Sequence, residues 1–491
     1  MKNFYQQLGL LLLVVVFSAQ AVLAAPVPAN NQAPAKSLAA QKQALAAVSK
    51  VRFSQTPEVM RIVFDVDKLP EYNVTMTGKP ESLEIELVGA TNKTGLPQIA
   101  FNDPAVKGLK FVDSGLSVKA VIELKHAVMY KVFTLKGPNR LVVDLIKVYD
   151  QKIQEEVAPG IKLTTLLRGR QEGPISAHVL DIDPKAGYAF KPVLSNEYVA
   201  NLETVKSMAD RTQAIAATNA SYFSLSGDIL GLLKMNGTIV STAGLARTAM
   251  GITPEGTVFI DQVDYDGNVL LPDKTLIPIG GINCERGPNS LVLYNSYYDS
   301  KTNTNDYGIE YIVVDSKVTA INKGNSEIPS NGIVLSVHGT MIEKFSALKI
   351  GDTIKVNQTL GEKWDKAVHI LSAGPRLVKN NSVYLTTKLE QFGSDVAGGK
   401  APRTALGMTK DGHILLAVVD GRQYSSVGFT LLEMALFMQE SGSVDAMNFD
   451  GGGSSEMVVN GTIVNKPSDG RERKVGNALI VVQQQREHLD N

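Results

Sequence analysis

Short segments in which apolar and polar residues alternate dominate the first 150 residues of the chain. Four of them lie at residues 60–66, 82–87, 119–124 and 140–145, and Gly, Pro and Asn stand between them. Alternation with period two places every second side chain on one face, which is typical of a β-strand with one buried face. The pattern predicts a separate all-β module of antiparallel strands at residues 51–149.

The remainder, from 160 to 485, contains many short apolar runs and only two segments with helical spacing. One is residues 202–211, whose apolar positions fall on one helical face. The other is residues 431–440, where Thr430 and Glu433 form a capping-box pattern. We therefore expect a mainly β protein with some helix (α+β), in which a β-sandwich module precedes a larger mixed α+β domain with few helices.

The N-terminus has the layout of a secretory signal peptide at residues 1–24. Lys2 precedes an apolar run at 8–17, and small residues follow before the expected cleavage after Ala24. The run is shorter than the ~20 apolar residues that span a bilayer, although a retained membrane anchor is the alternative. Residues 25–50 are rich in Ala, Pro, Gln and Asn and predict a linker. These features predict an exported bacterial protein that is periplasmic, associated with the cell wall or extracellular.

The composition argues against several classes of function. Lys plus Arg and Asp plus Glu both number 49, so no net field attracts nucleic acid or an anionic membrane. Cys284 is the single cysteine, which excludes a disulfide within the chain. The six histidines have no metal-ligand spacing, and Glu456 stands where a Gly-x-Ser-x-Gly elbow around Ser454 needs glycine. A zinc site and a serine-histidine triad are therefore not indicated.

One loop between two apolar runs suggests a binding site for an anion. Glycine leaves room for a ligand to approach the backbone amides, and an acidic residue precedes the glycines here. The alternative is a tight turn that only joins two strands. The residues of this loop that we consider as site candidates are Asp450, Gly451, Gly452, Gly453, Ser454 and Ser455.

Four arginines lie beside turns elsewhere in the larger domain. A planar guanidinium group matches two phosphate oxygens at once, so several arginines in converging turns predict a phosphate site. Each could equally be a surface residue or a partner of a structural carboxylate. Residues 394–402 form a polar, Gly-rich stretch directly before one of them and are a candidate lid. The four arginines are Arg247, Arg376, Arg403 and Arg422.

Three further polar residues have two interpretations each. Asp420 ends an apolar strand, as Asp450 does, and is either a carboxylate of the site or part of an Asp-Gly turn. Glu433 is either a catalytic acid or the helix cap noted above. Asn219 ends a buried strand and either orients a sugar hydroxyl or phosphate or satisfies a bend.

Residues from about 160 to 483 resemble the phosphodiester glycosidase family. The resemblance rests on the motifs at residues 218–223, 374–378, 403–407, 419–422 and 448–455, of which Asp-Gly-Gly-Gly-Ser-Ser is the most diagnostic. Phe449 stands where the family has Leu, and residues 285–365 contain no family motif, which suggests an insertion. Residues 51–149 resemble the AMIN family, β-sandwich modules of bacterial envelope proteins, through residues 61–65, 72–74 and 139–145.

The resemblance implies an exported hydrolase that cleaves a sugar-1-phosphodiester bond in a cell-envelope or extracellular glycan. Arginines and loop amides would hold the phosphate, and a carboxylate would stabilise an oxocarbenium-like carbon or activate water. Asp450, Asp420 and Glu433 are the candidates for the catalytic carboxylate, and Asn219 and Ser455 would orient the sugar. The AMIN-like module implies attachment to a cell-wall or extracellular glycan.

Two other functions are compatible with the same residues. One is a non-catalytic binder of anionic cell-wall polymer, and the other is an exopolysaccharide-processing glycosidase that attacks a linkage without phosphate. No cofactor is required by these motifs, and a divalent metal near Asp450 is compatible with the sequence but not demanded by it. We expect no nucleic-acid partner and, after signal cleavage, no stable transmembrane segment.

Overall fold

The structure is a computed structural model that describes residues 45–78, 81–242 and 244–484. The expected signal peptide at 1–24 lies outside the described residues, as does most of the expected linker at 25–50. Strand β1 (Ala46–Gln55) begins within the last residues of that expected linker. Among the described residues, no helix is long and apolar enough to cross a bilayer.

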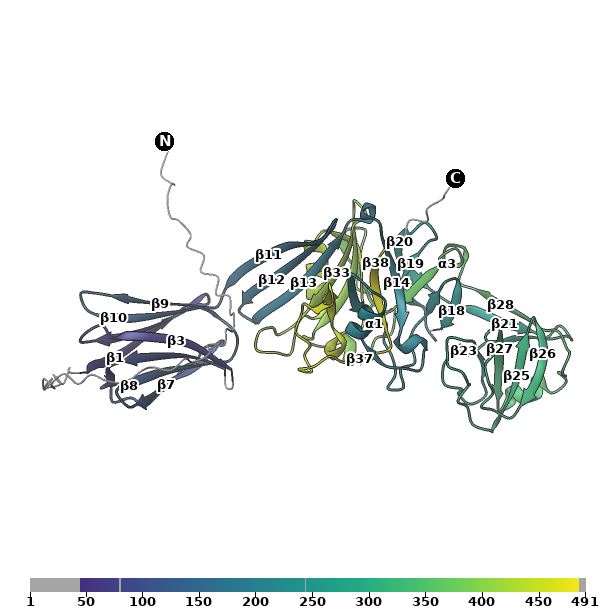
Figure 1. The fold of residues 1–491 in the computed structure, drawn as a ribbon, viewed down its shortest axis with the longest axis horizontal. Helices are drawn as coiled ribbons and strands as arrows, with labels where there is room; N and C mark the ends of the chain where they lie inside the picture. Colours follow the sequence, from purple (N-terminus) through teal and green to yellow (C-terminus); the bar gives the residue numbers. More distant parts are fainter. Residues whose placement is uncertain (1–44, 79–80, 243, 485–491) are drawn as a thin grey trace, which may run out of the picture. The chain divides into compact units, whose positions relative to one another are not determined.

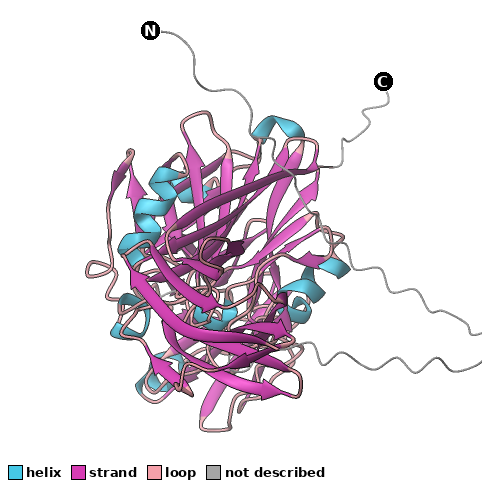
Figure 2. Cartoon of the chain, turned by 90° about the vertical axis from the view of Figure 1, so that its left-hand side faces the viewer, coloured by secondary structure: helices cyan, strands magenta, loops and turns pink. Residues whose placement is uncertain are grey.

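The expected fold class is confirmed, because strands dominate and the helices between them are few and short (Figure 2). The four alternating segments identified in the sequence are all strands. Each expected segment differs from the observed strand by no more than two residues at either end. The observed strands are β2 (Val59–Val66), β4 (Glu81–Val88), β8 (Ser117–Leu124) and β10 (Arg140–Ile146).

Two five-stranded sheets at residues 46–146 share one hydrophobic core. In β2 the side chains of Met60, Ile62 and Phe64 are fully buried while Arg61 between them is exposed, so the period of two is seen directly. The first sheet has the order β5 (Ala90–Asn92), β1, β2, β10 and β9 (Met129–Leu135). The second has the order β3 (Glu71–Gly78), β4, β8, β7 (Val106–Ser114) and β6 (Gln98–Ala100).

An eight-stranded sheet, of which Figure 1 labels β11, β12, β13 and β33, has several of the candidate residues at its strand ends. The hairpin expected around residues 410–412 is present as β32 and β33, which pair from Arg403 to Met408. The sheet has the order β11 (Tyr149–Ala158), β12 (Ile161–Arg170), β13 (Gly173–Ile182), β33 (Ile414–Val419), β32 (Arg403–Thr409), β34 (Ser443–Asn448), β30 (Arg376–Lys379) and β31 (Ser382–Val383).

Two further five-stranded sheets and a short strand pair complete the part of the chain that surrounds the site. The first sheet has the order β14 (Tyr188–Leu194), β38 (Asn477–Gln483), β16 (Ala216–Asn219), β35 (Met457–Val459) and β36 (Thr462–Ile463). The second has the order β18 (Thr238–Ser241), β17 (Leu233–Met235), β29 (His369–Ser372), β19 (Arg247–Ile252) and β20 (Val258–Val263). The pair is β15 (Glu203–Thr204) and β37 (Lys474–Val475).

The region at residues 266–359, which includes most of the segment 285–365 in which no motif was recognised from the sequence, is built mainly of strands and has a hydrophobic core of its own. Part of it also packs into the main core, because Val292, Tyr294 and Val334 belong to that cluster. Its three-stranded sheet has the order β22 (Leu276–Pro278), β21 (Asp266–Leu270) and β28 (Lys355–Thr359). Its five-stranded sheet has the order β23 (Gly281–Ile282), β24 (Leu291–Tyr294), β27 (Gly332–His338), β25 (Gly308–Val314) and β26 (Lys317–Asn322).

The two helices expected from apolar spacing are both present. Helix α1 (Val205–Arg211) begins three residues later than expected, because Thr204 caps it by accepting a hydrogen bond from the Ser207 N–H. Helix α5 (Leu431–Glu440) has the expected bounds and covers the eight-stranded sheet through Met434, Ala435 and Met438. The other helical elements are α2 (Thr340–Phe345), α3 (Glu362–Asp365), α4 (Ser394–Ala397) and the 3₁₀ turns η1 (Pro184–Ala186), η2 (Ser195–Glu197) and η3 (Gly452–Ser454).

Replacing Thr430 with Ala is expected to lower the free energy of unfolding by about 1 kcal/mol. The Thr430 hydroxyl accepts the Glu433 N–H, and the Glu433 carboxylate accepts the Thr430 N–H, so the change removes half of a complete capping box. Urea unfolding followed by circular dichroism measures the effect as a shift in midpoint at constant slope. Thr462→Ala, at an exposed strand position, is the control. Equal midpoints for the two variants would contradict the prediction.

A candidate active site around the Asp-Gly-Gly-Gly-Ser-Ser loop

The glycine-rich loop connects two sheets. It leaves β34 of the eight-stranded sheet after Asn448 and enters β35 of a five-stranded sheet at Met457. Asn219 fixes both halves of the loop, because its side-chain N–H donates to the Asp450 carbonyl at 2.6 Å and its Oδ1 accepts the Glu456 N–H at 3.2 Å. The Thr404 hydroxyl donates to the same Oδ1 at 2.8 Å. Asn219 therefore positions the loop from within the protein.

The backbone of the loop favours glycine at residue 452, and a side chain at residue 453 would displace Arg473. A Cβ on Gly453 would lie 2.0 Å from Arg473 Nη2, and Gly452 has a left-handed φ of 64°. Arg473 is thereby able to lie directly against the loop, where it also pairs with Asp469 at 2.7 Å. The glycines bring a cation close to the loop backbone.

The loop amides are less free than the sequence suggested. The Gly451 N–H donates to Asp450 Oδ1 at 2.8 Å, the Gly452 N–H to the Pro402 carbonyl at 2.9 Å, and the Ser454 N–H to the Gly451 carbonyl at 3.2 Å. These bonds hold the loop in shape. Side chains, rather than these three amides, are left to bind a ligand.

A cavity of about 540 Å³ opens beside the loop. It combines four cationic side chains with two carboxylates, Asp450 and Asp395, and one aromatic hydroxyl, Tyr222. The sequence candidates that it brings together are Arg403, Arg422, Asp450, Gly451, Gly452, Gly453 and Ser454. Arg473 and Lys474 line it as well and were not among the candidates.

Arg403 is a buried cation without a carboxylate partner among the described residues. Its side chain is 3% exposed, and its guanidinium donates to the carbonyls of Phe429 and Val396 at 3.0 Å and of Gly399 at 3.3 Å. Burial, together with the nearby Arg422, lowers the pKa of Arg403. Because carbonyl dipoles only partly offset a buried positive charge, an anion in the cavity would be strongly favoured.

Arg403 also anchors the stretch that the sequence marked as a candidate lid. The carbonyls of Val396 and Gly399 that it holds belong to α4 and the residues after it, and Asp395 and Val396 line the cavity.

The guanidinium group of Arg422 lies beside Gly452 of the loop. The backbone of Arg422 has a left-handed φ of 57°, which bulky residues rarely adopt. Strained backbone of this kind is concentrated at functional sites.

Asp450 is held in an environment that raises its pKa to about 6. Burial is the main cause, and hydrogen bonds from the Ser454 side chain and the Gly451 N–H oppose it, as does the charge of Arg473. A carboxyl group of this kind changes charge near neutral pH. Such groups are typical of catalytic sites.

Tyr222 connects the cavity to the ends of two strands. Its hydroxyl donates to the Gly374 carbonyl at 3.0 Å and accepts from the Asn448 side chain at 3.1 Å, and burial raises its pKa. Its ring packs on Phe392 with centroids 5.5 Å apart, and the Arg247 guanidinium lies 3.9 Å from the Phe392 ring centroid. Arg247 therefore supports the cavity wall through Phe392, although it does not line the cavity.

Two other sequence candidates are placed in structural interactions away from the cavity. Arg376 is 5% exposed, pairs with Asp445 and donates to the carbonyls of Val378 and Ile260, each at 3.1 Å. Glu433 caps α5 and pairs with Lys400 at 2.9 Å.

Asp420 and Ser455 also lie outside the cavity lining. Asp420 Oδ1 accepts from the Asn465 side chain at 3.1 Å and from the Lys466 N–H at 2.9 Å, so it fixes the segment after β36. The Ser455 hydroxyl is buried and has no hydrogen-bond partner in the described parts of the chain.

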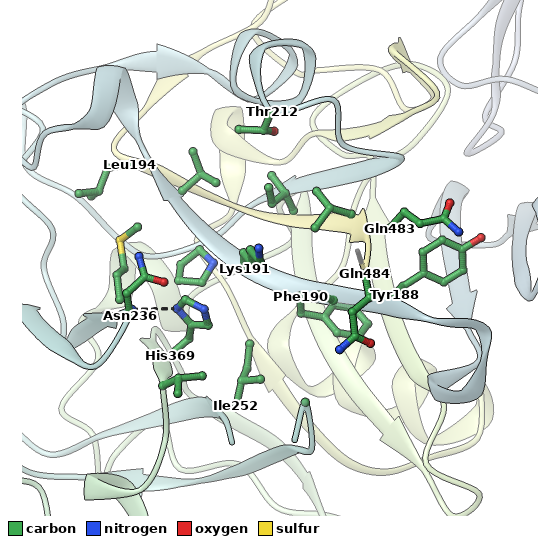
Figure 3. Close-up of a pocket in the computed structure, with 18 of the residues that line it drawn as sticks. Tyr188, Phe190, Lys191, Leu194, Thr212, Asn236, Ile252, His369, Gln483 and Gln484 are labelled. Atoms are coloured by element: carbon green, nitrogen blue, oxygen red, sulfur yellow. Dashed lines mark hydrogen bonds between the residues drawn. The ribbon is translucent and has the colours of Figure 1, made fainter. Parts of the chain in front are cut away.

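A larger cavity of about 910 Å³ lies around the edge strand β14 and has different chemistry (Figure 3). His369 and Asn236 lie together in it, and the Asn236 N–H donates to His369 Nδ1 at 3.4 Å. Burial, together with Lys191, lowers the pKa of His369 to about 4, so the ring is neutral at physiological pH. Its lining arginine, Arg211, already pairs with Glu197 and Glu203. This cavity offers no free arginine to a phosphate.

The described residues contain no evident metal site. No group of three or more His, Cys, Asp or Glu side chains there is arranged to hold a metal ion.

The family comparison covers most of the cavity. Residues 307–482 match the phosphodiester glycosidase family. The matched range includes Arg403, Arg422, Asp450 and Arg473, and Tyr222 lies before it.

The curated relatives match over short segments. The mouse N-acetylglucosamine-1-phosphodiester alpha-N-acetylglucosaminidase is 34% identical over 111 residues, which is 21% of this chain and 21% of that protein. The SPbeta prophage-derived uncharacterized protein YomE of Bacillus subtilis is 40% identical over 82 residues, which is 17% of this chain and 13% of that protein. The matched region therefore spans about a fifth or less of the length of either relative.

A solved structure extends the similarity of fold. The crystal structure of a hypothetical protein from Synechocystis superposes with a TM-score of 0.64 at 22% identity, covering 89% of this chain and 81% of that one. At this identity the comparison establishes a shared fold over most of the chain.

Proposed function

We propose that the protein is an exported hydrolase that cleaves the bond between the anomeric carbon of a sugar and a phosphodiester oxygen in a cell-envelope or extracellular glycan. The observation that carries the proposal is the cavity in which a buried arginine without a carboxylate partner, Arg403, lies with the carboxyl group of Asp450. A phosphodiester beside a sugar carries a negative charge where Arg403 needs one. The family match at residues 307–482 supports the same reaction.

The cations would hold the phosphate as it leaves. When the bond from C1 to the phosphodiester oxygen breaks, its electron pair goes to that oxygen and the phosphate gains charge. Arg403, Arg422 and Arg473 line the cavity and would stabilise this charge. Because the phosphate is a good leaving group, it needs little protonation. Water adds to C1 and loses a proton, which gives the free sugar and a phosphomonoester.

Asp450 would act on the sugar side of the bond. In its ionised form it would stabilise the positive charge that develops at C1 as the bond breaks. Asn219 fixes the Asp450 carbonyl at 2.6 Å and would keep the carboxyl group in place without touching the substrate. Asp395 on α4 is the second carboxylate of the cavity and would accept the proton of the attacking water.

The two sheets at residues 46–146 would serve as an AMIN-like module that attaches the enzyme to a cell-wall or extracellular glycan. One hydrophobic core shared by both sheets supports a separately folded module. Such attachment would raise the local concentration of substrate at the catalytic region.

The reaction is tested with the methyl phosphodiester of N-acetylglucosamine-1-phosphate in ¹⁸O-labelled water. We expect release of N-acetylglucosamine carrying ¹⁸O at C1 and of unlabelled methyl phosphate, measured by mass spectrometry. Label in the phosphate would show cleavage of the phosphorus–oxygen bond and overturn the proposal. Retention of cell-wall polymer without any released sugar would instead support the non-catalytic binder.

Replacing Ser454 with Ala is expected to move the acid limb of the pH–rate profile to higher pH, by several tenths to about one pH unit. The Ser454 hydroxyl donates to ionised Asp450 and so lowers its pKa from what burial alone would give. Activity that needs the carboxylate rises as pH passes the pKa of Asp450, near 6 in the unchanged protein, and losing this bond raises that pKa. The limb in kcat/KM measures the shift, and exposed Ser346→Ala is the control. An unmoved limb would count against Asp450 as the titrating group.

A further inference from the structure

Glu456, directly after the glycine-rich loop, is a buried carboxyl group that the proposed reaction does not use. It is 2% exposed, and its Oε1 is buried without a hydrogen-bond partner among the described residues. Its backbone is fixed, because its N–H donates to Asn219 Oδ1 at 3.2 Å. A buried carboxylate oxygen without a donor is costly, whereas a protonated carboxyl group supplies a donor of its own. The position therefore favours the neutral acid.

A second carboxyl group, that of Glu472, lies beside Glu456. Strand β37 begins at Lys474, which pairs with Thr204, the cap of α1, so the residues directly before β37 lie beside the first turn of α1. Glu456 reaches the same turn, where it accepts the Lys206 N–H. The two carboxyl groups are within hydrogen-bonding distance of each other, and Glu472 Oε1 is also buried without a donor in the described chain. Two carboxyl groups this close share a proton, because two like charges there would repel each other.

The cations around this pair, as far as the structure describes them, are engaged elsewhere. Three of them already pair with carboxylates, namely Lys206 with Asp210 at 2.7 Å, Arg211 with Glu203 at 3.1 Å and Arg473 with Asp469 at 2.7 Å. Lys474 lines the cavity beside the loop. Burial and the charge of Glu472 raise the pKa of Glu456 to about 8, and the Lys206 N–H opposes them. Glu456 is therefore neutral at physiological pH and ionises in the mildly alkaline range.

The segment before β37 carries both Glu472 and Arg473, and Arg473 is a cation of the cavity. The start of this segment is tied to the loop, because the Asn465 side chain donates to the Ser455 carbonyl at 3.1 Å. Its end is paired in β37. Between these two ties, the contact with Glu456 is next in sequence to the arginine. Repulsion between the two carboxylates would therefore displace Arg473.

We propose that Glu456 is a positioning residue, whose neutral carboxyl group donates to the Glu472 carboxylate and so holds Arg473 over the glycine-rich loop. This inference rests on the proposed function of the cavity. As pH rises through about 8, Glu456 loses its proton, the two carboxylates repel each other, and Arg473 moves away from the leaving phosphate. Activity therefore has an alkaline limit, separate from the acid limit that Asp450 sets.

The first test is the pH–rate profile of Glu456→Gln with the methyl phosphodiester of N-acetylglucosamine-1-phosphate. In the unchanged protein we expect kcat/KM to fall about 10-fold between pH 7 and pH 9, with a midpoint near 8. An amide N–H can donate to Glu472 at every pH, so the variant should keep the acid limb and lose the alkaline one. Exposed Glu343→Gln is the matched control and should keep both limbs. An alkaline limb that persists in Glu456→Gln, or is absent from the unchanged protein, would overturn the proposal.

A second variant shows whether the effect passes through Arg473. Arg473→Gln should lower kcat/KM at pH 7, because the cavity loses a cation. Its residual activity should be the same at pH 7 and pH 9, since the group that the repulsion displaces is gone. A residual activity that still falls about 10-fold at pH 9 would contradict a positioning role that acts on this arginine.

Thermal unfolding separates this inference from the proposed reaction. If the unchanged protein does not cleave the phosphodiester, the reaction fails, and the Tm of the unchanged protein and of Glu456→Gln between pH 5 and pH 9 still tests the carboxyl pair. Folding raises the pKa of Glu456 from 4.5 to about 8, so the folded protein holds the proton more tightly and this stabilisation is lost as pH rises across that range. The Tm of the unchanged protein, relative to the variant, should therefore fall by several degrees and then stay constant above pH 8. A difference in Tm that does not change with pH would overturn the shared proton.

Discussion

Replacing Asp450 with Asn is expected to lower kcat/KM for the methyl phosphodiester of N-acetylglucosamine-1-phosphate by about 10²- to 10⁴-fold. Asn retains the size of Asp and an oxygen that can accept the Gly451 N–H at the present 2.8 Å, so the loop should keep its shape. It cannot carry the negative charge that stabilises the developing cation at C1. Because the charge acts in the transition state, the loss should appear mainly in kcat.

The control for Asp450 is the same exchange at an exposed carboxylate in the turn between β32 and β33. Asp411→Asn should leave kcat/KM unchanged, and circular dichroism should show the same strand content for both variants. Asp450→Asn with nearly full activity would remove Asp450 from the mechanism and would direct attention to Asp395 as the working carboxylate.

Replacing Arg403 with Lys is expected to lower kcat/KM by about 10²- to 10³-fold. Lysine keeps the positive charge, but one ammonium group cannot reach the carbonyls of Phe429, Val396 and Gly399 that the guanidinium now holds and still face a phosphate. Both phosphate binding and the position of α4 should suffer. We therefore expect KM to rise as kcat falls, measured by steady-state kinetics.

Arg52→Lys is the matched control for Arg403, because Arg52 makes an exposed pair with Asp65 at 2.6 Å in the N-terminal sheets. Exposed pairs contribute little, so activity should not change. An Arg403→Lys enzyme whose kcat/KM matches the control would show that positive charge alone is sufficient and that the fork geometry is not used.

Strands and helices with clear periodicity could be predicted from the sequence. The alternation at residues 60–66 reports one buried face, and the structure shows Met60, Ile62 and Phe64 in the core. The capping pattern at Thr430 located the start of α5 because a side chain and a backbone N–H bond locally there. The sheet orders could not be predicted, because β13 pairs with β33, and β32 with β34, across long stretches of sequence that no local pattern records.

Only some of the candidate residues line the cavity beside the glycine-rich loop. Arg403 and Arg422 line the cavity, whereas Arg376, which is the first residue of its strand as Arg403 is, pairs with Asp445 instead. The side chain of a residue at a strand end can point to either face of the sheet, and the local sequence does not determine which face. Asp395 and Arg473 also line the cavity but were not among the candidates. The stretch at 394–402 had at least been identified as a lid, which was a usable signal for Asp395.

The glycine-rich loop crosses from β34 in one sheet to β35 in another, so the groups that we propose for catalysis belong to no single sheet. Arg403 starts a strand of the first sheet, and Asn219, which fixes the loop, ends a strand of the second. A protein engineer could not transplant this chemistry by grafting the loop alone onto another scaffold. Both sheets, and the junction that aligns them, would have to be transferred together with the loop.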